Sequence, residues 1–259
     1  NLPERRKNEL SQSVRMNLES PHVSSLHLLN EAPQNQTLYP GGKLHVYDLG
    51  WRSTFLDAIR YANAMLPPNT LFVIANADIV FAHESVRVLP RIKDPDVVVA
   101  LSRHEVHEDG HATLHEDPSL SQDAWFMRTP FPEDPGFDFP MGTLGSDNKL
   151  AYLYKTLNKT VVNWCNDVVI WHFHSSQHRG DKARLPRPYQ HVSSTRIDMK
   201  MLDSEWRVQT MSLKPAERGP FLQAITLDLP RLTGPPMAAS DVDKRSNDPE
   251  WSLSAVGQM

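Results

Sequence analysis

The segment TLFVIANADIVF, residues 70–81, constrains the fold of this chain more than any other feature. It is a near-continuous apolar run, which is typical of a strand buried on both faces of a parallel sheet. A second run of this kind, DVVVALSRH, lies at residues 96–104. Strand patterns alternate with helical patterns over residues 1–105. This alternation predicts a doubly wound α/β fold with a mostly parallel sheet flanked by helices.

Local signals predict the other elements and the domain boundary. The helix expected at residues 53–66 has Ser53 or Thr54 as its N-cap and Pro67-Pro68 as its stop. Beyond about Arg179 the sequence becomes Pro-rich and polar, with disorder expected after Gly234. We therefore expect one catalytic-sized domain at residues 1–180 and an irregular or partly disordered extension at 181–259. Further helices are expected at 3–18, 83–92 and 145–157, and further strands at 24–31, 43–49, 124–127 and 168–176.

Composition narrows the function classes. The 259 residues carry a net charge of −4 with scattered Lys and Arg, so nucleic acid is a poor partner. The single cysteine, Cys165, excludes an internal disulfide framework and is expected to be a small buried side chain. No apolar run approaches the roughly 18 residues that span a membrane. The compartment, cytoplasm or secretory-pathway lumen, would depend on a targeting segment that these residues do not contain.

Polar side chains follow the two buried strands. In doubly wound sheets, ligands bind beyond the carboxyl ends of the strands. Asn76 and Asp78 follow VIA, and Arg103 follows VVVAL. Strand alternation places Asn76 and Asp78 on one side, where two oxygen-bearing side chains suit Mg²⁺ or Mn²⁺. The alternative is a strand that ends in an ordinary turn, where Asn and Asp are common.

Histidines and carboxylates downstream extend this candidate site. His172 and His174 alternate in WHFHSS, and imidazole favours Mn²⁺ over Mg²⁺. Asp147 opens a predicted helix, either as a functional anion stabilised by the helix dipole or simply as a cap. Asp123 stands near Trp125, which either stacks on a sugar or packs in the core.

Arg52 is a second candidate, beside Arg103, for contact with an anionic ligand. It begins the helix predicted after DLGW, at the same edge of the sheet.

Five segments in a fixed order resemble a known family. NLESPHVSSLHLLNE, ANADIVF, SQDAWFM, GSDNKLAY and WHFHSS together are similar to GT-A-type glycosyltransferase domains of bacteria and of large algal viruses (chloroviruses), whose enzymes glycosylate the capsid. The likeness covers residues 5–180. It implies a hexosyl- or deoxyhexosyltransferase that takes a sugar from a nucleoside diphosphate sugar to a carbohydrate or glycoprotein acceptor. A D-x-D element holds the metal in that family, and Asn76 stands here in place of the first Asp.

The resemblance also implies residue roles. Asp78 would bind the metal, with Mn²⁺ favoured and Mg²⁺ as the alternative, and His172 or His174 would be a second ligand. Asn76 and Asp78, with Arg52 and Arg103, would bind the donor. Asp147 or Asp123 would be the acceptor-side carboxylate: a general base if the enzyme inverts, or a stabiliser of an oxocarbenium-like state if it retains. The first strand of such a domain is expected before Asn1.

Two rival functions remain open at this point. One is a metal-dependent hydrolase or nucleotidyltransferase that uses Asp78 with His172 and His174. The other is a non-catalytic domain that binds nucleotide sugars or carbohydrates. Two features favour it: Asn76 in place of the first Asp, and the missing first strand.

Overall fold

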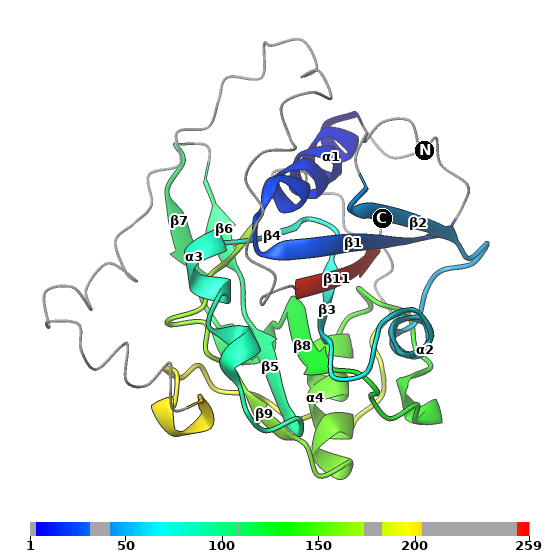
Figure 1. Ribbon diagram of the computed structural model, residues 1–259, viewed down its shortest axis with the longest axis vertical. Helices are drawn as coiled ribbons and strands as arrows, with labels where there is room; N and C mark the ends of the chain where they lie inside the picture. The colour runs from blue at the N-terminus through cyan, green and yellow to red at the C-terminus, as the bar shows by residue number, and fades with distance from the viewer. Residues whose placement is uncertain (1–3, 32–41, 108, 174–182, 204–252, 259) are drawn as a thin grey trace, which may run out of the picture.

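The larger of two sheets forms the centre of the protein. The computed structural model describes residues 4–31, 42–107, 109–173, 183–203 and 253–258. Seven strands follow the order β2-β1-β11-β3-β8-β5-β9, and β8 is antiparallel to both of its neighbours whereas the other pairs are parallel (Figure 1). Their bounds are β1 Val23–Asn30, β2 Leu44–Asp48, β3 Leu71–Asn76, β5 Val97–Leu101, β8 Ala124–Arg128, β9 Thr160–Val162 and β11 Leu253–Gln258.

A smaller sheet of four strands has the order β4-β10-β6-β7. It contains parallel and antiparallel pairs, so the predicted α/β class is confirmed with sheets that mix the two directions. One prediction is wrong: the run at residues 70–81 is not a single strand but two, β3 and β4, which belong to different sheets. The bounds are β4 Ile79–Phe81, β6 His104–Val106, β7 Ala112–Leu114 and β10 Ile170–His172.

Capping signals determine where the main helices begin. α2 starts after Thr54, whose side chain accepts a hydrogen bond from the Asp57 amide while the Asp57 carboxylate accepts one from the Thr54 amide. α4 starts after Gly145, which has a φ of 80° and lies against Tyr189. The helices are α1 Glu4–Glu19, α2 Phe55–Met65, α3 His83–Val86 and α4 Ser146–Thr156; short 3₁₀ turns are η2 Leu89–Arg91, η3 Pro118–Leu120, η4 Pro135–Phe137 and η5 Met199–Met201.

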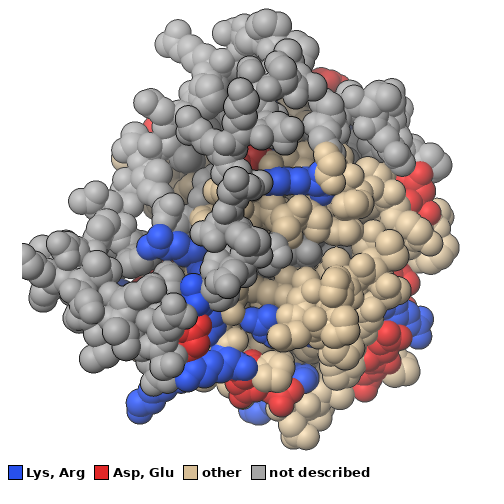
Figure 2. All heavy atoms as spheres, viewed as in Figure 1, with Lys and Arg blue, Asp and Glu red and all other residues tan. Residues whose placement is uncertain are grey.

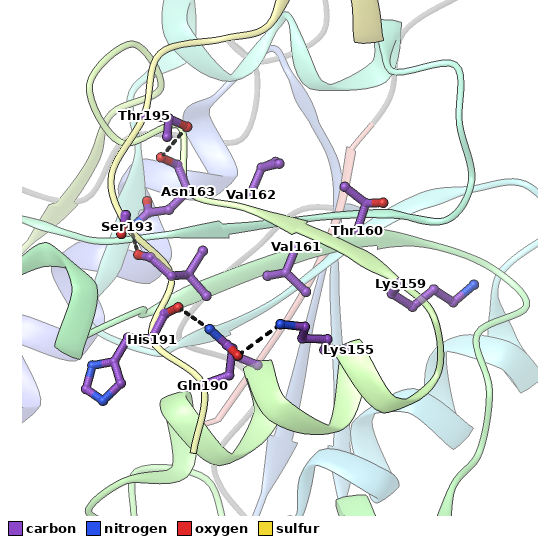
Figure 3. Close-up of a pocket in the computed structure, with 12 residues that line it drawn as sticks. Lys155, Lys159, Thr160, Val161, Val162, Asn163, Gln190, His191, Ser193 and Thr195 are labelled. Carbon is purple, nitrogen blue, oxygen red and sulfur yellow. Dashed lines mark hydrogen bonds between the residues drawn. The ribbon is translucent and has the colours of Figure 1, made fainter. Parts of the chain in front are cut away.

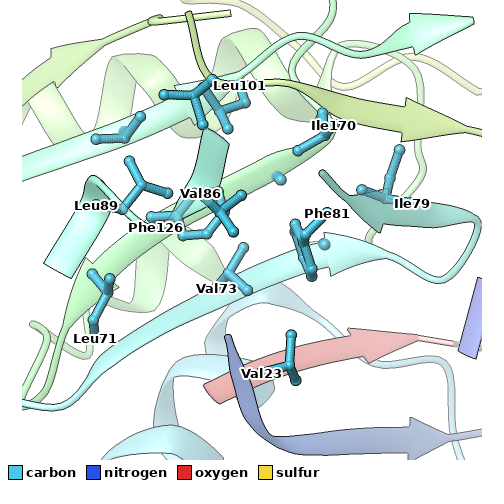
Figure 4. Close-up of a cluster of buried hydrophobic side chains, with 14 of the residues drawn as sticks. Val23, Leu71, Val73, Ile79, Phe81, Val86, Leu89, Leu101, Phe126 and Ile170 are labelled. Carbon is cyan, nitrogen blue, oxygen red and sulfur yellow. The ribbon is translucent and has the colours of Figure 1, made fainter. Parts of the chain in front are cut away.

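The two faces of the larger sheet bury separate apolar cores. Because side chains alternate along β3, Leu71 and Val73 pack on one face whereas Phe72 and Ile74 pack on the other. The first core also contains Phe81 of β4 and side chains from β5 and β8 (Figure 4). The second is covered by α2 and α4. β3 and β5 are therefore buried on both sides, which is the reason for their long apolar runs.

α1 belongs to the first face, where one side chain fixes it to the smaller sheet. Asn17 donates to the Ile79 carbonyl at 2.8 Å and accepts from the Phe81 amide at 3.1 Å. This pairing ties α1 to the strand that directly follows Asp78.

β11 is an element that the sequence did not predict. It comes from the stretch expected to be an irregular extension, yet it lies between β1 and β3 (Figure 1). The C-terminal part of the chain therefore contributes a central strand to the same sheet as residues 23–30 and 71–76.

Candidate functional site

The chain turns at the carboxyl end of β3, and this turn separates Asn76 from Asp78. Asn76 is the last residue of β3, and residues 77–78 form a turn before β4. The alternation expected to place both side chains on one side of a strand therefore does not apply, and the alternative of a strand-end turn describes the backbone correctly. Asn76 instead donates to Asp123 at 3.0 Å.

Asp78 is buried and holds two basic side chains. Its Oδ2 accepts a hydrogen bond from Arg6 of α1 at 2.7 Å, and His172 Nε2 lies 3.1 Å away. His172 reaches this position because β10 pairs with β4, where it stands opposite Ile79. Two predicted site residues are thus in direct contact, although they are far apart in the sequence.

His172 lies between two carboxylates. In the register of β10 with β6 it stands opposite Glu105, whose Oε2 is 2.7 Å from Nδ1. Burial opposes a charge on His172, but the hydrogen bonds with Asp78 and Glu105 outweigh burial and raise its pKa from 6.5 to about 9. For Glu105, burial is likewise overcome by His172 and Arg103, which lower its pKa to about 2. His172 is therefore an imidazolium at neutral pH, with both ring nitrogens donating.

Arg103 continues this chain of charges. It donates through Nε to Glu105 at 2.5 Å and through Nη1 to Asp123 Oδ2 at 3.0 Å. Nη1 also donates to Ser121 at 2.6 Å. We call the connected side chains the charged network; it contains three cations and four carboxylates, with Asn76 attached at one end: Arg6, Arg103, His172, Glu9, Asp78, Glu105 and Asp123.

Asp147 lies beside this network. It is half-buried in the first turn of α4, as predicted from GSDN, and its Oδ2 accepts a long hydrogen bond of 3.4 Å from the Gln122 amide. Burial, followed by the negative charge of Asp123, raises the pKa of Asp147 from 3.8 to about 7. Next to it, the buried side chains of Gln122 and Asn148 each retain an oxygen with no hydrogen-bond partner among the residues that the structure describes.

Three other candidates from the sequence have different positions. Arg52 donates to the Met141 carbonyl at 2.9 Å, in the loop that leads to α4, and makes no hydrogen bond with the charged network. Trp125 is buried in the core against Tyr154, so its core alternative is the correct one. His174 lies outside the described residues.

Asp78 and His172, the two predicted metal ligands that the structure describes, contact each other and further charged side chains. No group of three or more His, Cys, Asp or Glu side chains is placed to hold a metal among the residues that the structure describes. Asp78 Oδ2 contacts a guanidinium and an imidazolium, and an imidazolium offers no lone pair to a metal. A metal bound by Asp78 and His172 would have to displace the Arg6 guanidinium and the imidazole proton from this arrangement.

Sequence reasoning missed Arg6, Glu9 and Glu105. Glu105 had a usable signal, because it stands two residues after Arg103, just beyond the carboxyl end of the buried strand β5. Arg6 and Glu9 had none: in the sequence they are ordinary charges of an amphipathic helix. Only the packing of α1 against β4 brings them to Asp78.

A hollow of about 360 Å³ lies elsewhere, between α4, β9 and residues 190–195 (Figure 3). Lys155 spans part of it and donates to Gln190 at 3.3 Å. The predicted site residues are absent from the twelve described residues that line this hollow.

A second buried histidine, His27 of β1, has no carboxylate at either ring nitrogen among the described residues. Its ring nitrogens contact the Tyr61 hydroxyl at 3.0 Å and the Ser25 hydroxyl at 2.9 Å, and its ring stacks on His45 at 4.6 Å. Burial, with a smaller contribution from His45, lowers the pKa of His27 to about 4. This histidine is neutral at pH 7.

The surface and the comparisons add little to this description. On the face in Figure 2, Lys and Arg side chains of the described residues are interspersed with Asp and Glu side chains. Within the described ranges, none of the helices has the length and apolarity needed to cross a membrane.

Comparison with protein-family models, curated proteins and solved structures found no match.

Proposed function

We propose that this protein is a glycosyltransferase that moves a sugar from a nucleoside diphosphate sugar to an acceptor hydroxyl of a glycan or glycoprotein. One observation carries the proposal: side chains from separate predicted motifs meet at one edge of the sheet. Asn76 contacts Asp123, Asp123 contacts Arg103, and Asp78 contacts His172. The parallel order of the larger sheet, with β8 as its antiparallel strand, supports a GT-A-like arrangement.

The cations of the charged network are suited to the leaving group. When the bond from sugar to diphosphate breaks, negative charge develops on the phosphate oxygens, and fixed cations nearby stabilise it. Arg103 and Arg6 offer guanidinium groups, which match phosphate oxygens in geometry. Both now pair with carboxylates, so the donor has to compete with Asp78 and Asp123 for them. The mechanism thus assigns charge stabilisation to the protein's own side chains.

Asp147 is suited to act on the acceptor. A general base works best when its pKa lies near the operating pH, because it is then deprotonated often enough and still accepts a proton readily. Its pKa of about 7 meets this condition, whereas an ordinary carboxylate does not. We assign Asp147 as the base that takes the proton of the acceptor hydroxyl, and Asp123 as the carboxylate that orients Arg103 and Asn76.

Substitution of the two carboxylates tests these assignments. Transfer from a panel of uridine and guanosine diphosphate sugars is measured with donor affinity from calorimetry. Asp147→Asn should lower turnover by roughly 10²- to 10⁴-fold at unchanged donor affinity. In the unmodified protein, turnover should rise as pH increases through about 7, and Asp147→Asn should remove that rise. Asp123→Asn should weaken donor binding as well.

A control variant, a contrary outcome and a metal assay complete this test. Glu116→Gln changes an exposed carboxylate and should leave both measurements unaltered. Full turnover in Asp147→Asn would contradict the assigned base. Running each assay with EDTA, Mn²⁺ or Mg²⁺ checks the metal that the family resemblance predicts.

A non-catalytic domain that binds nucleotide sugars is the second candidate. It is favoured by the charged network itself, in which each of the three cations contacts a carboxylate and Asn76 replaces the expected Asp. Donor binding in calorimetry, with neither transfer nor hydrolysis on any acceptor, would select this candidate over the transferase.

A further inference from the structure

The last strand of the chain lies in the middle of the larger sheet. β11 pairs with β1 from Val23↔Leu253 to Leu29↔Gln258, and with β3 from Phe72↔Ser254 to Asn76↔Gln258. Both pairings are parallel, and β11 separates β1 from β3 throughout (Figure 1). Through backbone pairing, β11 is what connects the β2-β1 half of the sheet to the β3-β8-β5-β9 half.

The space that β11 fills has the width of one extended strand, and backbone groups that can form hydrogen bonds line both of its sides. Neighbouring strands are about 4.8 Å apart, so the flanking strands stand roughly 10 Å from one another, and one extended chain fits between them. Both flanking edges present backbone N–H and C=O groups that a strand satisfies. Recognition of an added strand rests on these main-chain hydrogen bonds. We call the space between β1 and β3 the strand slot.

The occupant of the strand slot is distant in sequence from both of its neighbours. β1 ends at Asn30 and β3 at Asn76, whereas β11 begins at Leu253. Pairings between segments so far apart close long loops, and such contacts generally form late in folding. Until β11 docks, β1 and β3 each present an open edge, which is a template for another strand.

From this topology we infer that the strand slot is a peptide-binding site whose ligand is the chain's own C-terminal segment, bound parallel to β1 and β3. The tethered segment normally occupies it. A separate peptide of the same sequence, or the segment of a second copy, binds when the tethered one is prevented from docking. This inference is independent of the transferase proposal, because it concerns backbone pairing alone.

Occupation of the slot also completes the edge that carries the candidate site. Gln258 is in register with Asn76, the residue that contacts Asp123. On the other side of β11, Asn30 of β1 donates to Asp48 of β2 at 3.2 Å. The C-terminal strand thus sets the spacing between these two polar ends of the sheet.

A proline in β11 of the full-length chain tests the inference. Val256→Pro removes one backbone donor from the middle of a central strand, a position that proline does not tolerate. A fluorescent peptide of residues 253–259 should bind this variant, as measured by anisotropy. Binding to the unmodified protein should be roughly a hundredfold weaker, because the tethered segment competes at a high effective concentration. Val256→Ala keeps the amide and should behave like the unmodified protein.

Two outcomes overturn the inference. The first is a Val256→Pro variant that retains the near-ultraviolet circular dichroism of the unmodified protein and still fails to bind the peptide. The second applies even if that variant does not fold: in the unmodified protein, the amides of residues 253–258 should exchange with deuterium as slowly as those of β3. Exchange as fast as in the free peptide would exclude a docked strand.

Discussion

His27 and His172 are both buried and both lie in strands, yet at neutral pH His27 is uncharged and His172 is a cation. His27 has two hydroxyl partners and stacks on His45, and its pKa falls to about 4. His172 has a carboxylate at each ring nitrogen, and its pKa rises to about 9. Burial disfavours the imidazolium at both positions, so the difference comes from the partners.

The comparison shows how the charged network differs from the rest of the interior. Around His27, polar groups satisfy hydrogen bonds without a net charge. Around His172, charges of both signs are held within about 3 Å of one another, which is costly unless every member keeps its partner. Such concentrations of perturbed groups are typical of functional sites, although structural ion pairs also produce them.

Removal of Asp78 should have the largest effect, a loss in the free energy of unfolding. Asp78→Ala leaves the buried His172 and the half-buried Arg6 without their shared carboxylate, and loss of one partner from a buried pair costs about 3–5 kcal/mol. We expect the free energy of unfolding in urea to fall by that amount. Glu116→Ala, at an exposed position, should change it by less than about 0.5 kcal/mol. If Asp78→Ala lowered the free energy of unfolding only slightly, the contacts of Asp78 in the charged network would not exist in solution.

Acid should weaken the protein through His27. Its folded pKa of about 4 lies below the unfolded value of 6.5, so the stability that depends on neutral His27 is complete above about 6.5 and decreases as pH falls towards about 4. His27→Gln does not titrate. The difference in unfolding free energy between the two proteins should therefore shift by about 2–3 kcal/mol between pH 7.5 and pH 4.5.

An exposed histidine provides the control for this titration. His191→Gln, which replaces an exposed histidine, is measured over the same pH range. If the difference in unfolding free energy for His27→Gln did not change with pH, folding would not lower the pKa of His27.

Glu105→Gln should have the smallest effect, a decrease in the pKa of His172 that leaves His27 unchanged. It removes one of the two carboxylates around His172 and keeps a side chain of similar size. One opposite charge at this distance changes a pKa by about 1–2 units, so the pKa of His172 should move down from about 9 by that amount. Titration of the histidine ring signals by NMR measures the shift, with Glu116→Gln as control. An unchanged pKa for His172, or a changed one for His27, would contradict the pairing described above.

Part of this arrangement was predictable from local sequence. The apolar runs predict β3 and β5, because strands buried on both faces need apolar side chains throughout. The capping residue Thr54 and the first-turn Asp147 were also visible as local signals. The position of polar residues after strands pointed to Asn76, Asp78 and Arg103 as neighbours, since the ends of parallel strands meet at one edge.

The sequence alone therefore determined the buried strands, the helix starts and the polar residues at the strand ends. All of these follow from periodicity and capping over a few residues. Only the tertiary structure decided that the chain turns after Asn76, that Arg6 reaches Asp78 and that residues 253–258 lie between β1 and β3. These features depend on contacts between segments far apart in the chain, and such contacts leave no periodic trace in either segment.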